Sequence, residues 1–582
     1  MMAFWRRNQS KSTWCLFGTF FVGYVLFMRN SSDGGSSTNG RRAAPPGGPP
    51  AAPGPPPGDQ AAVPDDQPVY PKPPLDAGGL GEMGKAVRLD LHGEEQKKEQ
   101  EGIDKHQINT YVSDRISLHR RLPDIWNPLC KDQKYDYRSL PTTSVVIAFY
   151  NEAWSTLLRT VHSVLETSPD ILLTEIILVD DFSDQEHLKA PLEAYLSAWR
   201  KVRLIRATKR EGLVRARLLG ASISTGQVLT FLDCHCECHS GWLEPLLHRI
   251  KEAPSAVVCP VIDVINWNTF EYLGNPREPQ IGGFDWRLVF TWHSVPPYEQ
   301  KHRRSPVDVI RSPTMAGGLF SISTRYFLHL GTYDTGMEIW QCGGSLEVHP
   351  CSHVGHVFPK RAPYSRSKAL SNSIRAAEVW MDGYKDVYYH RNPHARLDQD
   401  VEPFGDVTDR LRLRSQLGCK SFQWYLENIY PDLTVPEDRP GMFGMLKNRG
   451  KTNFCFDYNP VNEEVIAGQR IILYSCHGMG QNQFFELSSL GEIQFNTRFP
   501  AGCATGDNIS TYLVLQLCRT RLKPVIPDQK FHLREDGTLF HESSGKCVEA
   551  VDATDNGTPA PALRPCSDSA HQRWFFEEKI PS

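Results

Sequence analysis

At 582 residues, the chain is too long for a single ordinary core, so two or more domains are expected. Lys and Arg number 64 against 67 Asp and Glu, which gives a formal net charge of -3. This balance excludes the domain-wide basic field of a nucleic-acid-binding protein, and we expect no nucleic-acid partner.

The N-terminal region carries a membrane-targeting pattern. An uncharged apolar run from Thr13 to Met28 predicts a transmembrane signal anchor after a cytosolic tail, residues 1–12. Arg6, Arg7 and Lys11 precede the run, so the positive-inside bias places everything after it in the lumen. A cleaved signal peptide is the alternative, although no A-x-A-like site follows. Either way, an oxidising lumen permits disulfides.

Residues 29–112 are predicted to form a stem. The stretch from Pro45 to Pro74 contains 13 prolines, a composition that cannot bury a core and favours an extended spacer. The remainder is polar and charged, with no evident chemistry.

Strand and helix patterns then alternate four times. Apolar strand patterns at 143–152, 175–184, 202–212 and 228–235 are separated by helical spacing or polar helical stretches. This alternation predicts an α/β fold, a parallel sheet wrapped by helices, with ligands beyond the carboxyl ends of the strands. Those ends carry Asn151 and Glu152, Asp180 and Asp181, Lys209 and Arg210, and Asp233 with His235.

The stretch LDCHCECHSGW, residues 232–242, concentrates potential metal ligands. On an extended backbone, Asp233 and His235 would point to one face and Cys234 to the other. A carboxylate with an imidazole suits a divalent ion that also binds phosphate oxygens, Mn2+ above all. A zinc site would need paired thiolates at C-x2-4-C spacing; zinc and a structural cysteine-rich turn remain alternatives. A third ligand is expected from His349, His353 or His356.

Eight strings in order carry a specific resemblance: LPTTSVVIAFYNEAWSTLLRT, EIILVDD, KREGLVRARLLGA, LTFLDCHCEC, GGFDWRL, PTMAGGLF, CSHVGHVF and RAAEVWMD. From about Ser113 onward, the sequence resembles the polypeptide N-acetylgalactosaminyltransferases. The resemblance implies a single-pass type II protein of the Golgi membrane with a lumenal catalytic part. It implies a Rossmann-like GT-A catalytic domain at 113–400, a linker at 401–440 and a ricin-type β-trefoil lectin domain at 441–582.

The implied reaction initiates mucin-type O-glycosylation. GalNAc moves from UDP-GalNAc to Ser or Thr hydroxyls of proteins, with retention and with Mn2+. Asp233, His235 and His356 correspond to the metal ligands. The resemblance places Asp181, Arg210, Cys234, Gly317, Gly318, Trp340 and Tyr364 at the UDP-GalNAc donor, and Trp286 and Phe358 at the acceptor peptide. No carboxylate stands out as a covalent nucleophile, so no catalytic residue is assigned.

The C-terminal part repeats itself three times. Three cysteine pairs, with Q-x-W-like ends in QNQFFE and HQRWFFE, indicate a β-trefoil with one disulfide in each repeat. The expected pairs are Cys455 with Cys476, Cys503 with Cys518, and Cys547 with Cys566. The cysteines and the Q-x-W-like ends are expected mainly to build the trefoil core. The resemblance implies that only Asp457, His477 and Asn482, in the first repeat, bind GalNAc-bearing glycopeptides. The second and third repeats have Thr505 and Glu549 instead of the aspartate.

Cysteines outside the trefoil and N-glycosylation sequons complete the lumenal pattern. The resemblance implies two further disulfides, Cys130 with Cys351 and Cys342 with Cys419. Sequons occur at Asn30, Asn508 and Asn556.

The chain departs from the family pattern after Met337. The family continues its Y-D-x-G-M-x-[IV]-W string into W-G-G-E-N-[LI]-E before W-Q-C-G-G, whereas Trp340 here passes directly into Gln341. Roughly a dozen residues that include a donor-sugar loop are missing, and losing one well-aimed polar contact alone costs about 10²- to 10³-fold in rate. The alternative function is therefore a catalytically impaired Golgi protein that binds GalNAc-glycopeptides.

Overall fold

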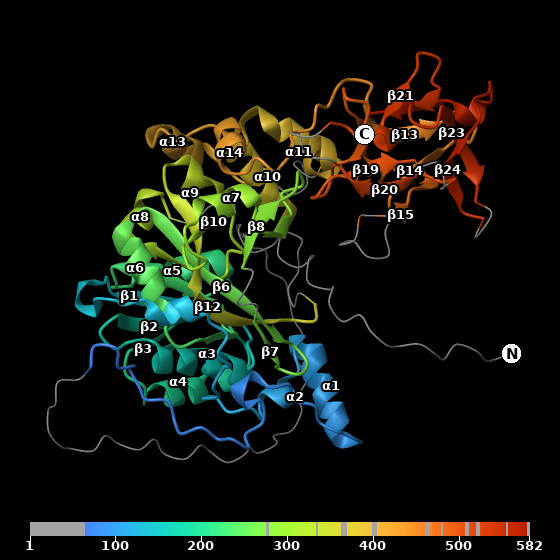
Figure 1. The fold of residues 1–582 in the computed structure, drawn as a ribbon. Helices are drawn as coiled ribbons and strands as arrows, with labels where there is room; N and C mark the ends of the chain where they lie inside the picture. Colours follow the sequence, from blue (N-terminus) through green and yellow to red (C-terminus); the bar gives the residue numbers. More distant parts are fainter. Residues whose placement is uncertain are drawn as a thin grey trace, which may run out of the picture. The chain divides into compact units, whose positions relative to one another are not determined.

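The computed structural model describes residues 64–274, 279–332, 336–361, 369–397, 404–459, 466, 468–478, 481–506, 511–518, 524–553 and 557–578. They divide into two compact units, which we call the sheet unit (64–281 and 294–361) and the trefoil unit (282–293 and 369–578) (Figure 1). The apolar run Thr13–Met28, the three sequons and Tyr364 lie outside the described residues. No helix within the described ranges combines the length and the apolarity needed to cross a membrane.

The first half of the sheet unit has the predicted alternation. Strand order is β3-β2-β1-β4, and these neighbours pair in parallel. The strands are β1 (Thr143–Phe149), β2 (Leu173–Asp180), β3 (Val202–Arg206) and β4 (Val228–Leu232), and the helices between them are α3 (Trp154–Thr167), α4 (Ala190–Leu196) and α5 (Leu213–Ser222).

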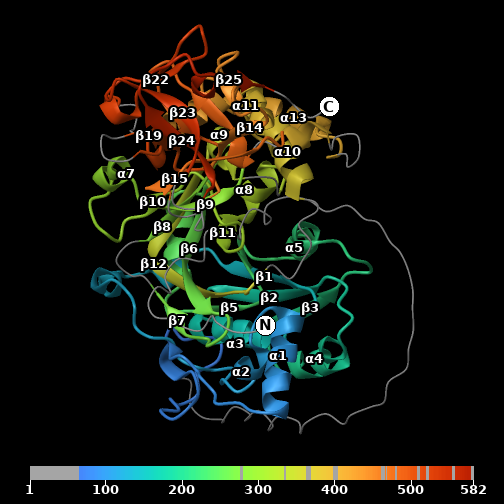
Figure 2. The same cartoon turned by 90° about the vertical axis from the view of Figure 1, so that its right-hand side faces the viewer.

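Side-chain alternation along β1 explains how helices cover both faces of this sheet. Val145 and Ile147 join the buried cluster that contains Leu157 of α3. Val146 faces the other way, where a Cβ added to Gly220 of α5 would lie only 2.5 Å from Val146 Cγ1. In Figures 1 and 2, α5 accordingly lies on one side of these strands, and α3 and α4 lie on the other.

The second half of the sheet is mixed, which the alternation of the first four strands does not predict. β11 (Phe320–Ser323) is antiparallel to both β4 and β6 (Ala256–Asn266), and β12 (Ser345–Phe358) is parallel to β6. Short strands β5 (Cys236–Cys238), β7 (Tyr272–Leu273) and β10 (Ile310–Arg311) complete it, with β5 antiparallel to β12. β11 enters between β4 and β6 in the opposite direction, and the four alternating patterns of the sequence end before it.

Part of the predicted stem packs on the sheet unit. Val69 is 4% exposed, joins the cluster of α3 and donates its N–H to the Ser168 carbonyl at 3.3 Å. Further on, α1 (Glu94–His106) and α2 (Thr110–Ser113) contribute the buried Ile103 and Val112. The proline count does not reveal this packing, because it depends on a few apolar residues between the prolines.

The trefoil unit begins with helices and ends with short strands. Helices α10 (Ala369–Trp380), α11 (Lys385–Arg391) and α12 (Pro393–Leu397), expected in the catalytic domain, group with this unit. They are followed by α13 (Thr408–Gln416), α14 (Phe422–Asn428) and strands that include β13 (Phe443–Asn448), β14 (Phe454–Asp457), β16 (Ile472–Ser475), β19 (Gly502–Thr505), β23 (Lys546–Asp552) and β25 (Trp574–Glu577).

The repeated Q-x-W-like ends build a common core. Gln483, Gln529 and Gln572 are each 0% exposed, and the aromatic residue two positions later, Phe485, Phe531 or Trp574, joins one buried cluster. Each glutamine amide hydrogen-bonds a backbone carbonyl: that of Ser475, Leu517 or Pro565. Buried glutamines at equivalent positions are thus structural, because each amide nitrogen finds a backbone carbonyl inside the core.

Disulfides join the pairs implied for the trefoil: Cys455–Cys476, Cys503–Cys518 and Cys547–Cys566. In the sheet unit, Cys130 is bonded to Cys351, across a sequence separation of 221. Cys342 and Cys419 are also disulfide-bonded.

We predict that Glu244 makes stability depend on pH. This residue of α6 (Leu243–Glu252) is 6% exposed, its Oε1 accepts a hydrogen bond from the Tyr137 hydroxyl at 3.4 Å, and burial raises its pKa to about 7. The folded state therefore binds the proton more tightly than the unfolded state. The stabilisation is full below the unfolded pKa and is lost as pH rises toward 7.

Glu244→Gln should raise the free energy of unfolding by about 2–3 kcal/mol at pH 8 and change it little at pH 4. Urea denaturation at both pH values measures this. The control is Glu252→Gln in the same helix, where the side chain is exposed. Equal gains at both pH values would contradict the assignment.

Candidate functional site

Asp233 and His235, which follow β4, lie close to a third potential ligand from a strand that is distant in the sequence. Asp233 follows β4, His235 immediately precedes β5, and His356 lies in β12, opposite Cys236 in the antiparallel β5–β12 pair. The Val357 N–H donates to the His235 carbonyl at 3.1 Å. One potential ligand atom from each of Asp233, His235 and His356 lies within 4.8 Å of the other two. The structure therefore brings together a carboxylate and two imidazoles.

The Asp-Cys-His segment turns instead of continuing β4. Cys234 and His235 form a turn between β4 and β5, so the argument that alternation points Cys234 away from His235 is wrong. The Cys234 S–H donates to Glu152 Oε2 at 3.0 Å, and the same oxygen lies 2.9 Å from His235 Nδ1. The ligands converge because of this turn and the pairing with β12.

The nearby cysteines do not form a knot. Cys234, Cys236 and Cys238 are free and buried, and burial raises the pKa of each thiol. No disulfide joins these three residues, and the C-x-C-x-C spacing does not give the paired thiolates of a zinc site.

The other two candidate histidines have structural partners. His353 contacts Asp263 Oδ2 through Nδ1 at 2.9 Å and the Pro350 carbonyl through Nε2 at 3.0 Å. The Cys351 N–H donates to His349 Nδ1 at 3.2 Å. Of the three, His356 is the one grouped with Asp233 and His235.

Glu152 orients one ligand. This residue follows β1, and its Oε1 accepts hydrogen bonds from the Ala153 N–H at 2.9 Å and the Thr156 hydroxyl at 3.0 Å. Burial alone would raise its pKa, but the hydrogen bond and charge of His235 hold the pKa at about 2. Because Glu152 engages His235 Nδ1, the Nε2 atom is left for a metal, an arrangement common around metal-binding histidines. The sequence placed Glu152 at this edge without giving it a role.

Arg217 orients a second ligand. It lies in α5, is 0% exposed, and donates to Asp233 Oδ1 at 2.8 Å and to the carbonyls of Gly317 and Gly318, each at 2.7 Å. Burial would raise the Asp233 pKa, but the hydrogen bond with His356 and the Arg217 charge hold it at about 2. A Cβ at Gly318 would lie 2.5 Å from Asp233 Oδ2, so glycine keeps this side of the carboxylate open. No sequence pattern indicated a role for Arg217.

Asp181 and Arg210 meet at the neighbouring strand ends. The Asp181 carboxylate is buried, accepts the N–H groups of Glu211 at 2.7 Å and Gly212 at 2.9 Å, and pairs with Arg210. The Arg210 guanidinium lies 3.6 Å from the ring centroid of Tyr150, which is 43% exposed. Tyr150 adds an aromatic surface that was not predicted.

The remaining donor and acceptor candidates have different surroundings. Phe358 ends β12, and its ring centroid lies 4.4 Å from that of His356. Trp340 in α9 (Met337–Gln341) is buried and donates its indole N–H to the Ser312 carbonyl at 2.9 Å. Trp286, in the trefoil unit, is 2% exposed and donates to the Thr434 carbonyl at 2.8 Å. Both tryptophans thus have their polar atom satisfied within the protein.

The first trefoil repeat contains a polar cluster. Asp457 is 1% exposed and accepts from the side-chain amides of Asn482 and Gln483, each at 2.9 Å. Burial raises its pKa, while the charge of nearby His477 opposes the rise. Asn482 and His477 are half-buried, so the cluster reaches the surface.

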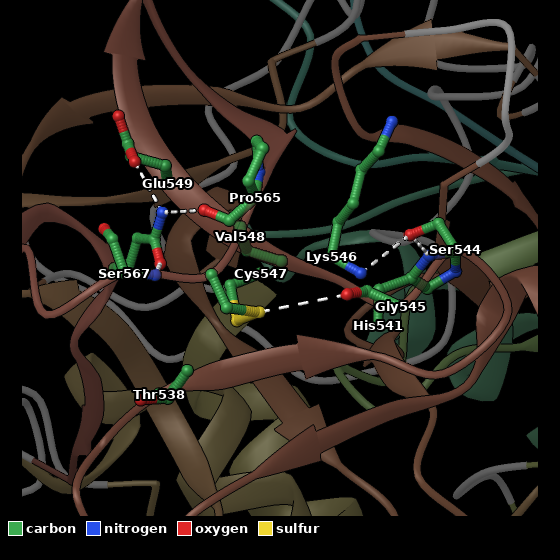
Figure 3. Close-up of a disulfide and its surroundings, with 12 residues drawn as sticks. Thr538, His541, Ser544, Gly545, Lys546, Cys547, Val548, Glu549, Pro565 and Ser567 are labelled. Carbon is green, nitrogen blue, oxygen red and sulfur yellow. Dashed lines mark hydrogen bonds between the residues drawn. A yellow bond between two sulfur atoms is a disulfide. The ribbon is translucent and has the colours of Figure 1, made fainter.

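The third repeat differs from the first at this position. Glu549, beside the Cys547–Cys566 disulfide, accepts from Gln572 Nε2 at 2.6 Å, and the same amide donates to the Pro565 carbonyl at 2.9 Å (Figure 3). His571 stands where the first repeat has Asn482, so no second amide reaches Glu549. The two clusters are therefore not equivalent.

Comparisons with known proteins identify both parts of the chain. The family profile for glycosyl transferase family 2 matches residues 144–327, and the profile for the ricin-type beta-trefoil lectin domain matches residues 442–574. The predicted combination of a transferase domain and a trefoil lectin domain is therefore confirmed.

Curated relatives match over nearly the whole chain. Polypeptide N-acetylgalactosaminyltransferase 12 of Mus musculus is 66% identical over 527 residues, covering 88% of this chain and 90% of the relative. The Homo sapiens protein of the same name is 64% identical, with 88% and 89% covered. A crystal structure of GalNAc-T7 with UDP, GalNAc and Mn2+ is similar at a TM-score of 0.68 and 32% identity, covering 88% of this chain and 95% of that one.

We predict that Glu152→Gln lowers the affinity for a divalent ion by roughly 10- to 100-fold, because a neutral amide holds His235 less firmly. Titration of Mn2+ followed by electron paramagnetic resonance measures the free ion. The control is Glu186→Gln, at an exposed glutamate in the short 3-10 helix Glu186–Leu188, which should leave the affinity unchanged. Unaltered binding in the Glu152 variant would show that this carboxylate does not support the ligand.

Proposed function

This chain belongs to the polypeptide N-acetylgalactosaminyltransferase family, and we propose that it transfers GalNAc from UDP-GalNAc to Ser and Thr hydroxyls of proteins, with retention. The observation that carries this proposal is the convergence of Asp233, His235 and His356. It occurs in a chain that is 66% identical to polypeptide N-acetylgalactosaminyltransferase 12 of Mus musculus over 527 residues. GalNAc-T7, which the structure resembles, was crystallised with UDP, GalNAc and Mn2+.

The side chains of Asp233, His235 and His356 fit Mn2+. A carboxylate and two imidazoles suit this ion, and one potential ligand atom from each residue already lies within 4.8 Å of the other two. When bound by Asp233, His235 and His356, Mn2+ supplies positive charge to the diphosphate that departs with the nucleotide.

The surrounding side chains fix this arrangement before substrate arrives. Arg217 holds one oxygen of Asp233 and leaves the other toward His356, while Glu152 fixes the His235 ring. Gly317 has a φ of 81° and, with Gly318, presents its carbonyl to Arg217, so this backbone segment is tied to the same carboxylate. We assign this backbone to the wall beside the donor sugar. Preorganisation of this kind reduces the reorganisation needed during reaction.

We assign the Asp181–Arg210 pair to the uridine nucleotide. Two backbone N–H groups and Arg210 orient the Asp181 carboxylate at the strand edge. The exposed face of Tyr150 against Arg210 offers a surface for a base. Cys234 lies in the turn beside His235 and is 8% exposed, which supports a contact with the donor through its backbone or thiol.

For the acceptor peptide, the surroundings support Phe358 more than Trp286. Phe358 lies beside His356 at the end of β12, whereas Trp286 is buried with its N–H donated to Thr434. We therefore propose Phe358 as an acceptor contact and a structural role for Trp286. Trp340, similarly buried, supports the fold near the donor rather than the sugar itself.

The trefoil adds a second binding activity. We propose that Asp457, His477 and Asn482 bind GalNAc already present on a peptide. Their half-buried cluster is supported by the Gln483 amide. A tethered sugar site raises the effective concentration of acceptor near the catalytic site.

The shortened stretch after Met337 bears on the competing function, a catalytically impaired glycopeptide-binding protein. Here α9 leads through Cys342 into β12, and His356 at the far part of β12 still reaches Asp233. Residues Tyr333 to Thr335 lie outside the described residues. The similarity of this chain to named transferases across both domains favours the enzyme.

We propose that Thr13–Met28 anchors the chain in the Golgi membrane as a single-pass type II protein with a lumenal catalytic part. Basic residues before the run and the disulfides after it support this topology.

The proposed transfer is tested with UDP-GalNAc, Mn2+ and a Ser/Thr-rich mucin peptide, followed by mass spectrometry. The chain should form GalNAc-peptide, and Asp233→Asn should lower kcat/KM at least about 10²- to 10³-fold, because it weakens the metal ligand that also pairs with Arg217. Glu252→Gln, on the exposed end of α6, is the control. Retained glycopeptide binding without any product would establish the impaired alternative instead.

The lectin assignment predicts a selective defect. Asp457→Asn should lower transfer to GalNAc-bearing glycopeptides by about tenfold or more, because the effective-concentration gain is lost, and leave transfer to unmodified peptides unchanged. Glu549→Gln in the third repeat is the matched control and should affect neither substrate. Initial rates on paired peptides with and without a distant GalNAc measure the difference. Equal losses on both peptides would indicate misfolding or a catalytic effect.

A further inference from the structure

A second group of potential metal ligands lies on α3, separate from the Asp233 cluster. His162 and Glu166 are four residues apart on this helix and therefore face the same side. His119, from the segment between α2 and β1, completes the group, and one ligand atom from each residue lies within 4.8 Å of the others. None of these residues belongs to the proposed transferase site.

The geometry leaves buried polar atoms without hydrogen bonds. His162 is 0% exposed, and its Nδ1 lies 3.7 Å from Glu166 Oε1, which also contacts His119 Nδ1. Within the described part of the chain, His162 Nδ1 has no hydrogen-bond partner; Glu166 Oε2 also has none, but it lies on the side of Lys72. Buried polar atoms in this condition are rare and call for an explanation, such as a bound ion.

The donor set matches zinc. Two imidazoles and one carboxylate form the three-ligand set of many open Zn2+ sites, with a fourth position for water. The 3.7 Å between His162 Nδ1 and Glu166 Oε1 is close to the roughly 3.3 Å that tetrahedral zinc with bonds of about 2.0 Å requires. The Tyr195 hydroxyl, 2.7 Å from His162 Nε2, fixes the ring in the way outer contacts fix zinc-bound histidines. The His119 side chain is 31% exposed, which gives an ion a route from solvent.

One neighbour opposes a cation. Lys72 Nζ lies 4.0 Å from Glu166 Oε2 and donates to the Arg120 carbonyl at 3.1 Å. An ion held on the Oε1 side would share Glu166 with this ammonium, which lowers the affinity without blocking the ligands.

A metal ion at this second group would stabilise β5, the strand that follows His235. Two hydroxyls of α3 hold β5: Thr160 Oγ1 accepts the Cys236 N–H at 2.8 Å, and Ser163 Oγ accepts the Cys238 N–H at 3.1 Å. His162 lies between these two residues, on the same helical turn. An ion that fixes this turn to the His119 segment would also fix the position of β5.

We propose that His119, His162 and Glu166 bind one zinc ion, with water at the fourth position, and that this ion supports the packing of α3 on β5. The opposing interpretation is a buried hydrogen-bond network that binds no metal.

Zinc content of the full chain tests the proposal. After incubation with Zn2+ and gel filtration, plasma mass spectrometry should find about one bound zinc per chain in Asp233→Asn, where the first cluster is impaired. Adding His119→Ala or Glu166→Gln should lower that content at least tenfold. Adding His248→Ala should not, because the imidazole of His248 lies outside this cluster, where it pairs with Glu252 and packs against the Tyr135 ring. His119 is part-exposed, so its variant should fold, which circular dichroism checks.

A second variant separates zinc binding from a hydrogen-bond network. Lys72→Gln should tighten Zn2+ binding several-fold in a competition titration with a chromogenic chelator, because it removes the opposing charge. No zinc in the Asp233→Asn chain, or equal zinc after His119→Ala in a folded protein, would overturn the proposal. Unchanged affinity in Lys72→Gln would show that any zinc present is held elsewhere.

Discussion

The antiparallel pairing of β5 with β12 is the constraint on which the proposed active site depends. It sets His356 opposite Cys236, one residue beyond His235, and so joins ligands more than a hundred positions apart in the sequence. A register slip of one residue would turn His356 to the opposite face of the strand and leave Asp233 and His235 without a third ligand. β12 resists such a slip because it also pairs along most of its length with β6.

Buried charge pairs hold the ligands in that register. Asp233 is balanced by Arg217, and Glu152 is balanced by His235, in surroundings where an isolated charge would be strongly destabilising. Arg217 holds Asp233 Oδ1, and Oδ2 faces His356. Glu152 holds His235 Nδ1 and leaves Nε2 for a metal. The packing that stabilises the sheet unit and the geometry needed for transfer are thus properties of the same few side chains.

Much of this architecture could be predicted from the sequence, because local patterns encode it. The βαβ alternation, the Asp-x-His string and the repeated Q-x-W-like ends gave the domain types and most of the site. The missing information was long-range. Arg217 is one arginine in a basic helix, and nothing in its neighbours reveals that it is fully buried beside Asp233. The turn at Cys234, the mixed half of the sheet and the packing of Val69 likewise depend on partners distant in sequence. Trp286 and Trp340 matched family positions, but only their hydrogen bonds showed how far each is committed to the core.

The Cys130–Cys351 disulfide gives the sheet unit an order of assembly. Cys351 lies in β12, five residues before His356, whereas Cys130 precedes β1, so a growing chain exposes the first thiol long before its partner is made. Covalent closure and completion of the ligand set therefore both await the same late strand. A chain interrupted before β12 would therefore contain the Asp181–Arg210 pair and the Asp-x-His segment. It would have neither the Cys130–Cys351 bond nor the His356 imidazole.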